Sequence, residues 1–156
     1  MLPEIQLYVE RLQDRRTEIL KTLDGLELAA LDWRPAGPET NSLVVLAVHS
    51  VGSERRWIHQ VIGGKSIERD RAAEFRARSE AINTLTALYT AAANETEQVL
   101  ANLTAEDMEA RRELPTRSCT VRWAILHVLE HYDEHLAHMG LTRQLWENRT
   151  TRPHEI

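Results

Sequence analysis

The chain has 156 residues, of which 42% are hydrophobic and 28% charged, with 19 Lys and Arg against 24 Asp and Glu and a net charge of −5. A chain of this length most simply forms one domain with a real core. The acidic balance argues against a general nucleic-acid binder, which would show a basic face. The only cysteine, Cys119, excludes an intrachain disulfide and a zinc site built from thiolates.

The N-terminal residues lack the basic-then-apolar pattern of a secretion signal. The longest apolar run, Leu43 to Val48, is far too short to span a membrane. We therefore expect no membrane partner and a cytoplasmic location.

Four segments carry apolar residues at the i, i+3, i+4, i+7 spacing of amphipathic helices, and no segment alternates as a strand does. The first helix is expected to start near Pro3 and to end in the turn-rich segment that follows Asp24. The second is expected from about Ser42 to Ile62, with Asn41 or Ser42 as its cap and the glycines from Gly63 as its stop.

The third helix is expected from roughly Asp70 to Leu103, or from near Ser79 after a shorter separate piece. The basic cluster 69–78 is interleaved with acidic residues and suggests a solvated helix face. The fourth helix is expected after Pro115, from Val121 to about Trp146. The prediction is an all-α fold, a four-helix bundle with long connections in one domain over 1–150, followed by a C-terminal tail, 151–156.

The stretch "HVLEHYDEHLAHMG" contains four of the seven histidines of the chain. On a helical wheel they share one face about 80° wide, beside the apolar stripe of the fourth helix. Side chains four residues apart stack over one turn, so His127 with His131, or His131 with His135, can point toward one ion. The alternative is a solvated stripe whose histidine pKa values stay near about 6.5.

A third ligand must come from another helix, and His49 is the best candidate because it shares a face of the second helix with Leu46, Ser53, Trp57 and Gln60. Three imidazoles around one divalent ion form a site with open positions. A carboxylate-bridged di-iron centre is not supported, because the chain has no Glu-x-x-His. A thermolysin-like protease is not supported either, because His-Glu-x-x-His is absent.

The segment "NSLVVLAVHSVGSERRWI", followed about eighty residues later by "HVLEHYDEHLAH", resembles the DinB/YfiT-like superfamily of small bacterial metal-binding proteins. The resemblance implies a four-helix bundle with one divalent metal held by His49, His131 and His135. His127 and His138 would then be pocket or ligand-orienting residues. Glu54 matches an acidic position that is frequent in the family. It would either have a functional role or form a surface or interhelical ion pair. Leu136, Ala137 and His138 replace the Arg-Gly-Gln of many members, which leaves the substrate open.

The resemblance also implies an activity, a thiol-dependent S-transferase that joins a low-molecular-weight thiol such as bacillithiol or mycothiol to an electrophile. A metal-dependent hydrolase is an alternative. Another alternative is a non-enzymatic metal-binding or stress-response protein. In such a protein, His127 or His138 would close the metal site as a fourth ligand. Zinc or nickel is the expected metal, with manganese or iron as further options. Outer residues such as Leu145 and Trp146 suggest a homodimer.

Overall fold

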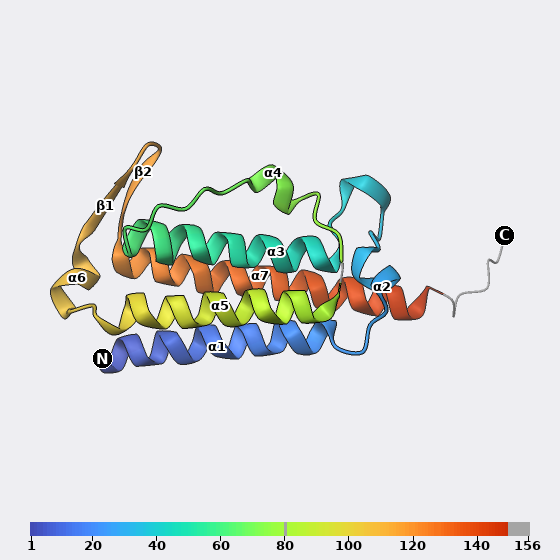
Figure 1. Ribbon diagram of the computed structural model, residues 1–156, viewed down its shortest axis with the longest axis horizontal. Coiled ribbons are helices and arrows are strands. Elements are labelled where there is room, and N and C mark those ends of the chain that lie inside the picture. Colours follow the sequence, from blue (N-terminus) through green and yellow to red (C-terminus); the bar gives the residue numbers. More distant parts are fainter. Residues whose placement is uncertain (80, 150–156) are drawn as a thin grey trace.

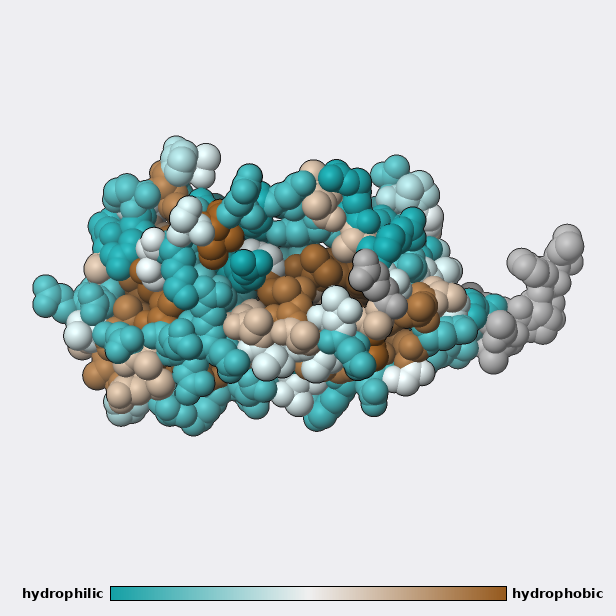
Figure 2. Space-filling model, in the orientation of Figure 1, coloured by the Kyte–Doolittle hydropathy of each residue, from teal (hydrophilic) through white to brown (hydrophobic). Residues whose placement is uncertain are grey.

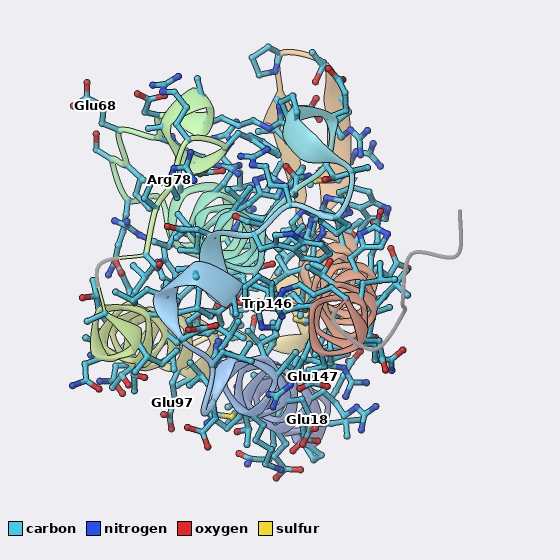
Figure 3. The ribbon with its side chains drawn as sticks, turned by 90° about the vertical axis from the view of Figure 1, so that its right-hand side faces the viewer. Glu18, Glu68, Arg78, Glu97, Trp146 and Glu147 are labelled. Atoms are coloured by element: carbon cyan, nitrogen blue, oxygen red, sulfur yellow. The ribbon has the colours of Figure 1, made fainter. Side chains whose placement is uncertain are left out.

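The computed structural model describes residues 1–79 and 81–149, so the expected tail at 151–156 lies outside the described residues. Four long helical rods lie side by side as a bundle (Figure 1). Seen end-on in Figure 3, they are arranged around the core in the order α1, α5, α3, α7. The rods are α1 (Pro3–Leu23), α3 (Leu43–Glu54) continued by η2 (Arg55–Ile62), α5 (Ile82–Ala101) and α7 (Val121–Asn148). The predicted all-α four-helix bundle is confirmed.

The first, second and last helices begin where the sequence predicts, because the residues at their ends fit a helix start. Pro3 occupies the first turn of α1, where its missing N–H costs nothing. The Ser42 side chain accepts a hydrogen bond from the backbone N–H of Val45 and caps α3. Apolar residues at helical spacing then face inward, as Ile5 and Leu12 of α1 do at 0% exposure.

The second rod changes its winding halfway along. After Glu54 the chain continues as η2, a π-helix, in which the backbone hydrogen bonds span five residues instead of four. Gly63 ends this helix, and Gly64 turns the chain with a φ of +68°. The expected limits of the second helix are therefore confirmed. Its π-helical second half was not predicted from the sequence.

The expected third helix is divided, as its alternative start near Ser79 anticipated. Residues 63–79 form a strap that crosses the outside of α3 and contains one short helix, α4 (Arg71–Glu74), capped by Asp70 (Figure 1). After α4 the Ser79 backbone N–H donates to Asp32 at 2.9 Å, a bond that ties the strap to the short helix α2 (Leu28–Asp32). The helix α5 starts only at Ile82.

The expectation of no strands was wrong for the segment before the last helix. After α6 (Ala105–Glu109), the strands β1 (Arg111–Leu114) and β2 (Arg117–Thr120) form an antiparallel hairpin in which Arg112 pairs with Cys119. Four residues per strand are too few to show a period-two pattern, so the sequence indicated only that the last helix begins after Pro115. The structure shows Pro115 between the two strands.

A buried carboxylate at the centre of the bundle is bonded to one residue of each of the other three helices. Glu54 of α3, 0% exposed, receives hydrogen bonds from Arg16 of α1, Thr96 of α5 and Tyr132 of α7. Burial alone would raise the pKa of Glu54, but the Arg16 guanidinium and the two hydroxyls outweigh it and hold the pKa below its usual value. We call these four residues the Glu54 node.

The outer surface of the bundle is mixed. Figure 2 shows apolar residues in the middle of one face and toward both of its ends, separated by hydrophilic ones. Within residues 1–79 and 81–149, no helix has the length and apolar character needed to cross a membrane.

Replacing Glu54 by Gln should lower the free energy of unfolding by about 3–5 kcal/mol, because it leaves the Arg16 guanidinium buried without a counter-charge. Urea unfolding followed by circular dichroism measures this. Adding Arg16→Met to Glu54→Gln should recover part of the loss. Arg11→Gln, which removes an exposed pair with Asp14, is the control and should cost less than about 1 kcal/mol. A Glu54→Gln loss as small as that of the control would contradict the role of the node.

Candidate metal centre

Three of the histidines singled out by the sequence meet between α3 and α7. His49 lies in the middle of α3, and His131 and His135 lie one turn apart on α7. The Nε2 atom of His131 is 3.3 Å from Nε2 of His49 and 3.1 Å from Nε2 of His135. The two helices thus bring three Nε2 atoms together. We call His49, His131 and His135 the triad.

The triad matches the geometry that one ion requires. Its ligand atoms all lie within 4.8 Å of one another. Nitrogen atoms bound at about 2.0–2.1 Å around a tetrahedral ion are about 3.3 Å apart. The two spacings from Nε2 of His131, 3.3 Å to His49 and 3.1 Å to His135, are close to this value. The three residues could therefore hold a metal ion, and imidazole nitrogen suits first-row divalent transition metals.

The protonation of the triad also fits ligation. Burial, reinforced by the neighbouring histidines, lowers the pKa of His131 to about 3. Burial also lowers the pKa of His135 to about 4 and shifts the pKa of His49 downward. All three rings are consequently neutral at neutral pH, with a lone pair free on one nitrogen. A solvated stripe with ordinary pKa values does not describe these residues.

The His49 ring is oriented from its outer side by the strap. Its Nδ1 lies 2.8 Å from Oε2 of Glu74 on α4, and the Arg69 guanidinium donates to both carboxylate oxygens at 2.6 and 2.7 Å. Burial alone would raise the pKa of Glu74, but the bonds from Arg69 and His49 lower it. An ionised carboxylate only accepts, so Nδ1 carries the proton and Nε2 presents its lone pair to the triad.

Sequence reasoning missed Glu74 and Arg69, because the basic cluster to which they belong was read as a solvated face. Glu74 is in fact 8% exposed and Arg69 pairs with it. One signal was present in the sequence. Gly52 lies inside the helix α3, and a Cβ atom there would lie 2.6 Å from Cδ of Glu74. An isolated glycine in a helix indicates such a close approach.

The remaining predicted site residues lie outside the triad. The rings of His127 and His138 are centred 6.2 Å from His131 and 5.9 Å from His135, on opposite sides. Glu54 is held in the node, in the ion-pair arrangement that was one of its two readings. In the part of the chain that the structure describes, no fourth His, Cys, Asp or Glu joins the three donors.

Comparison with known proteins decides the family. The family model described as mycothiol-S-transferase matches residues 8–148. The chain belongs to the mycothiol-S-transferase family. This family is part of the DinB-like superfamily, which confirms the resemblance seen in the sequence.

A solved structure shares the fold of this mycothiol-S-transferase family member. The conserved protein of a locus from Enterococcus faecalis superposes with a TM-score of 0.75 at 14% sequence identity, over 93% of this chain and 98% of the other. At that identity the similarity concerns the fold alone. No curated protein matches the sequence.

Gly52→Ala in this family member should displace the Glu74 carboxylate and release Nδ1 of His49, because the new methyl group occupies the place of that carboxylate. Nitrogen-15 NMR of the histidine rings in metal-free protein would show the loss of the Nδ1–H tautomer of His49. Glu74→Ala should have the same effect, and the double variant should add nothing to it.

The control for this experiment is Gly140→Ala on α7, because a Cβ atom there meets no atom within 4 Å. It should leave the tautomer unchanged and stabilise the helix by about 0.5–1 kcal/mol. An unchanged His49 tautomer in both Gly52→Ala and Glu74→Ala would contradict the orienting role of Glu74.

Proposed function

We propose that this protein is a divalent-metal-dependent S-transferase, which joins a low-molecular-weight thiol to an electrophilic carbon. The observation that carries the proposal is the triad itself, three neutral Nε2 atoms converging without a fourth protein donor in the described chain. Membership of the mycothiol-S-transferase family supports a thiol as the first substrate, with mycothiol as the foremost candidate.

The metal ligands in this proposal are His49, His131 and His135. A divalent ion held by three neutral imidazoles keeps its double positive charge and favours the thiolate form of a thiol that reaches an open position. All-imidazole sites accept several first-row ions, with zinc or nickel foremost here and manganese or iron as further options.

The surrounding residues prepare the ligands for this task. Glu74 holds His49 in the tautomer that presents Nε2, and Arg69 fixes Glu74 in turn. In the transfer the sulfur–carbon bond forms and the leaving group departs with its electron pair. The proton of the thiol is lost to solvent. His127 and His138 border the triad on either side and shape the space for the two substrates.

The two alternative functions lack an observation of this kind. A storage or sensing site would be closed by a fourth ligand, whereas the rings of His127 and His138 are centred away from the triad. A hydrolase is expected to place a free carboxylate base beside the ion. The buried carboxylates of the described chain, Glu54 and Glu74, are each paired with an arginine.

Purified protein should carry about one divalent metal ion per chain, and His135→Ala should abolish this binding, because two remaining imidazoles do not form a tight site. Elemental analysis after gel filtration measures the content. At a hundredfold excess over the dissociation constant, the ion should stabilise the fold by about 2.7 kcal/mol. His138→Ala is the control and should keep the metal. Full occupancy in His135→Ala would remove the proposed ligand set.

The loaded protein should consume mycothiol in the presence of an aromatic chloro-nitro electrophile, and faster than it consumes bacillithiol, glutathione or cysteine. The activity should disappear with chelator and in His135→Ala. It should persist in His138→Ala, which keeps the metal ligands and changes only the space beside them. Thiol loss and product formation are followed by absorbance and mass spectrometry. If no thiol in the panel is consumed above the uncatalysed rate, the S-transferase proposal fails.

A further inference from the structure

A hollow lies beside the triad, between η2, the tip of the hairpin and the first half of α7. Arg56 and Trp57 of η2, residues 114–117 of the hairpin and His127 of α7 line it. We call it the hairpin pocket. Its His127 ring is centred 6.2 Å from the ring of His131, so one lining residue of the pocket is the neighbour of a triad residue.

The rings of Trp57 and His127 line the hairpin pocket, and both contact Trp123, which lines the neighbouring hollow that shares Arg117. The ring of His127 is stacked on Trp123, with centroids 4.8 Å apart and planes at 11°. Trp57 meets both edge-on, at 5.1 Å from His127 and 5.4 Å from Trp123. The two lining rings form an aromatic wall, which offers flat apolar surface to a planar carbon skeleton. The π-helical winding of η2, a feature often found at functional sites, presents Trp57 and Arg56 to this pocket.

Two positive charges in the hairpin pocket have no carboxylate partner in the described chain. The side chain of Arg56 is half-buried and makes neither an ion pair nor a hydrogen bond there. Arg117 is exposed, and its guanidinium lies over the Trp123 ring at 5.0 Å. By contrast, Arg16 and Arg69 are both neutralised by a glutamate. Unpaired guanidinium groups beside an apolar wall attract anions and match a carboxylate in shape.

We propose that the hairpin pocket binds the carboxylate of an electrophilic co-substrate with a flat, unsaturated carbon skeleton. Arg56 and Arg117 hold the carboxylate, the aromatic wall holds the skeleton, and the reactive carbon points toward the triad. This inference rests on the proposed function and names the class of its second substrate. The charge is assigned to the electrophile because the hollow is lined by flat rings, which fit a planar skeleton.

The binding test uses benzoate and benzamide, which share shape and differ in charge, with the fluorescence of Trp57 and Trp123 as the readout in metal-loaded protein. Wild-type protein should bind benzoate about tenfold more tightly than benzamide. Arg56→Gln and Arg117→Gln should each reduce that preference, and the double variant should abolish it. Arg78→Gln, an exposed strap residue placed near α4 in Figure 3, removes the same charge elsewhere and should keep it.

The transfer test uses a chloronitrobenzoate and its primary amide with the same thiol. Sulfur bonds to the ring carbon, chloride leaves with its electron pair, and the thiol proton goes to solvent. In the double variant Arg56→Gln/Arg117→Gln, the KM for the acid should rise about tenfold or more while the KM for the amide and the metal content stay unchanged.

The two proposals fail in different ways. Equal affinity of wild-type protein for benzoate and benzamide, or an unchanged preference in the double variant, overturns the carboxylate pocket whatever the transfer assay shows. A clear benzoate preference that depends on Arg56 and Arg117 supports the pocket even if neither chloronitro compound is converted, an outcome that counts against the S-transferase activity alone. The wild-type comparison needs no variant, so it decides the matter even if a variant misfolds.

Discussion

The structure depends on one buried charge, the carboxylate of Glu54. Removing an ion from water is costly, and the cost is offset only when Arg16, Thr96 and Tyr132 all reach it. Because these partners come from the other three helices, the node fixes the axial position of each helix relative to its neighbours. His49 lies five residues before Glu54, and His131 directly precedes Tyr132. The register that satisfies the carboxylate is thus the register in which the imidazoles meet.

The candidate centre combines two kinds of support. The long helices α3 and α7 supply the three donor nitrogens from a rigid frame, which keeps them within 4.8 Å of one another. The strap supplies Glu74, which selects the tautomer of His49 from outside the bundle. Burial keeps the rings neutral, and so prevents the mutual repulsion that three imidazolium charges would create. The helix frame, the tautomer of His49 and the neutral state of the rings therefore all favour the same arrangement of the three histidines.

Periodic features were predictable from the sequence, and short tertiary ones were not. The four helices and the meeting of His49 with His131 and His135 follow from apolar stripes and the four-residue spacing. The hairpin and the contact of the strap with His49 were not predicted, because strands and helices of four residues carry no period, although a separate piece before Ser79 was one of the expected alternatives. Glu74 contacts His49, 25 residues away, and Arg117 contacts Trp123, only when those segments fold back on the bundle. Gly52 alone hinted at the contact.

The strap is the least regular part of the site, with four helical residues between Gly63 and Ser79. It is fastened by the bond from Arg34 to the Phe75 carbonyl and by the Phe75 ring, 4.7 Å from that of His49. Its docking and the state of the His49 ring are thermodynamically linked, and linkage is reciprocal. An ion that binds more tightly when the strap is docked on His49 would therefore stabilise the docked strap. A change that undocks the strap would lower the affinity of the site for that ion by the same factor.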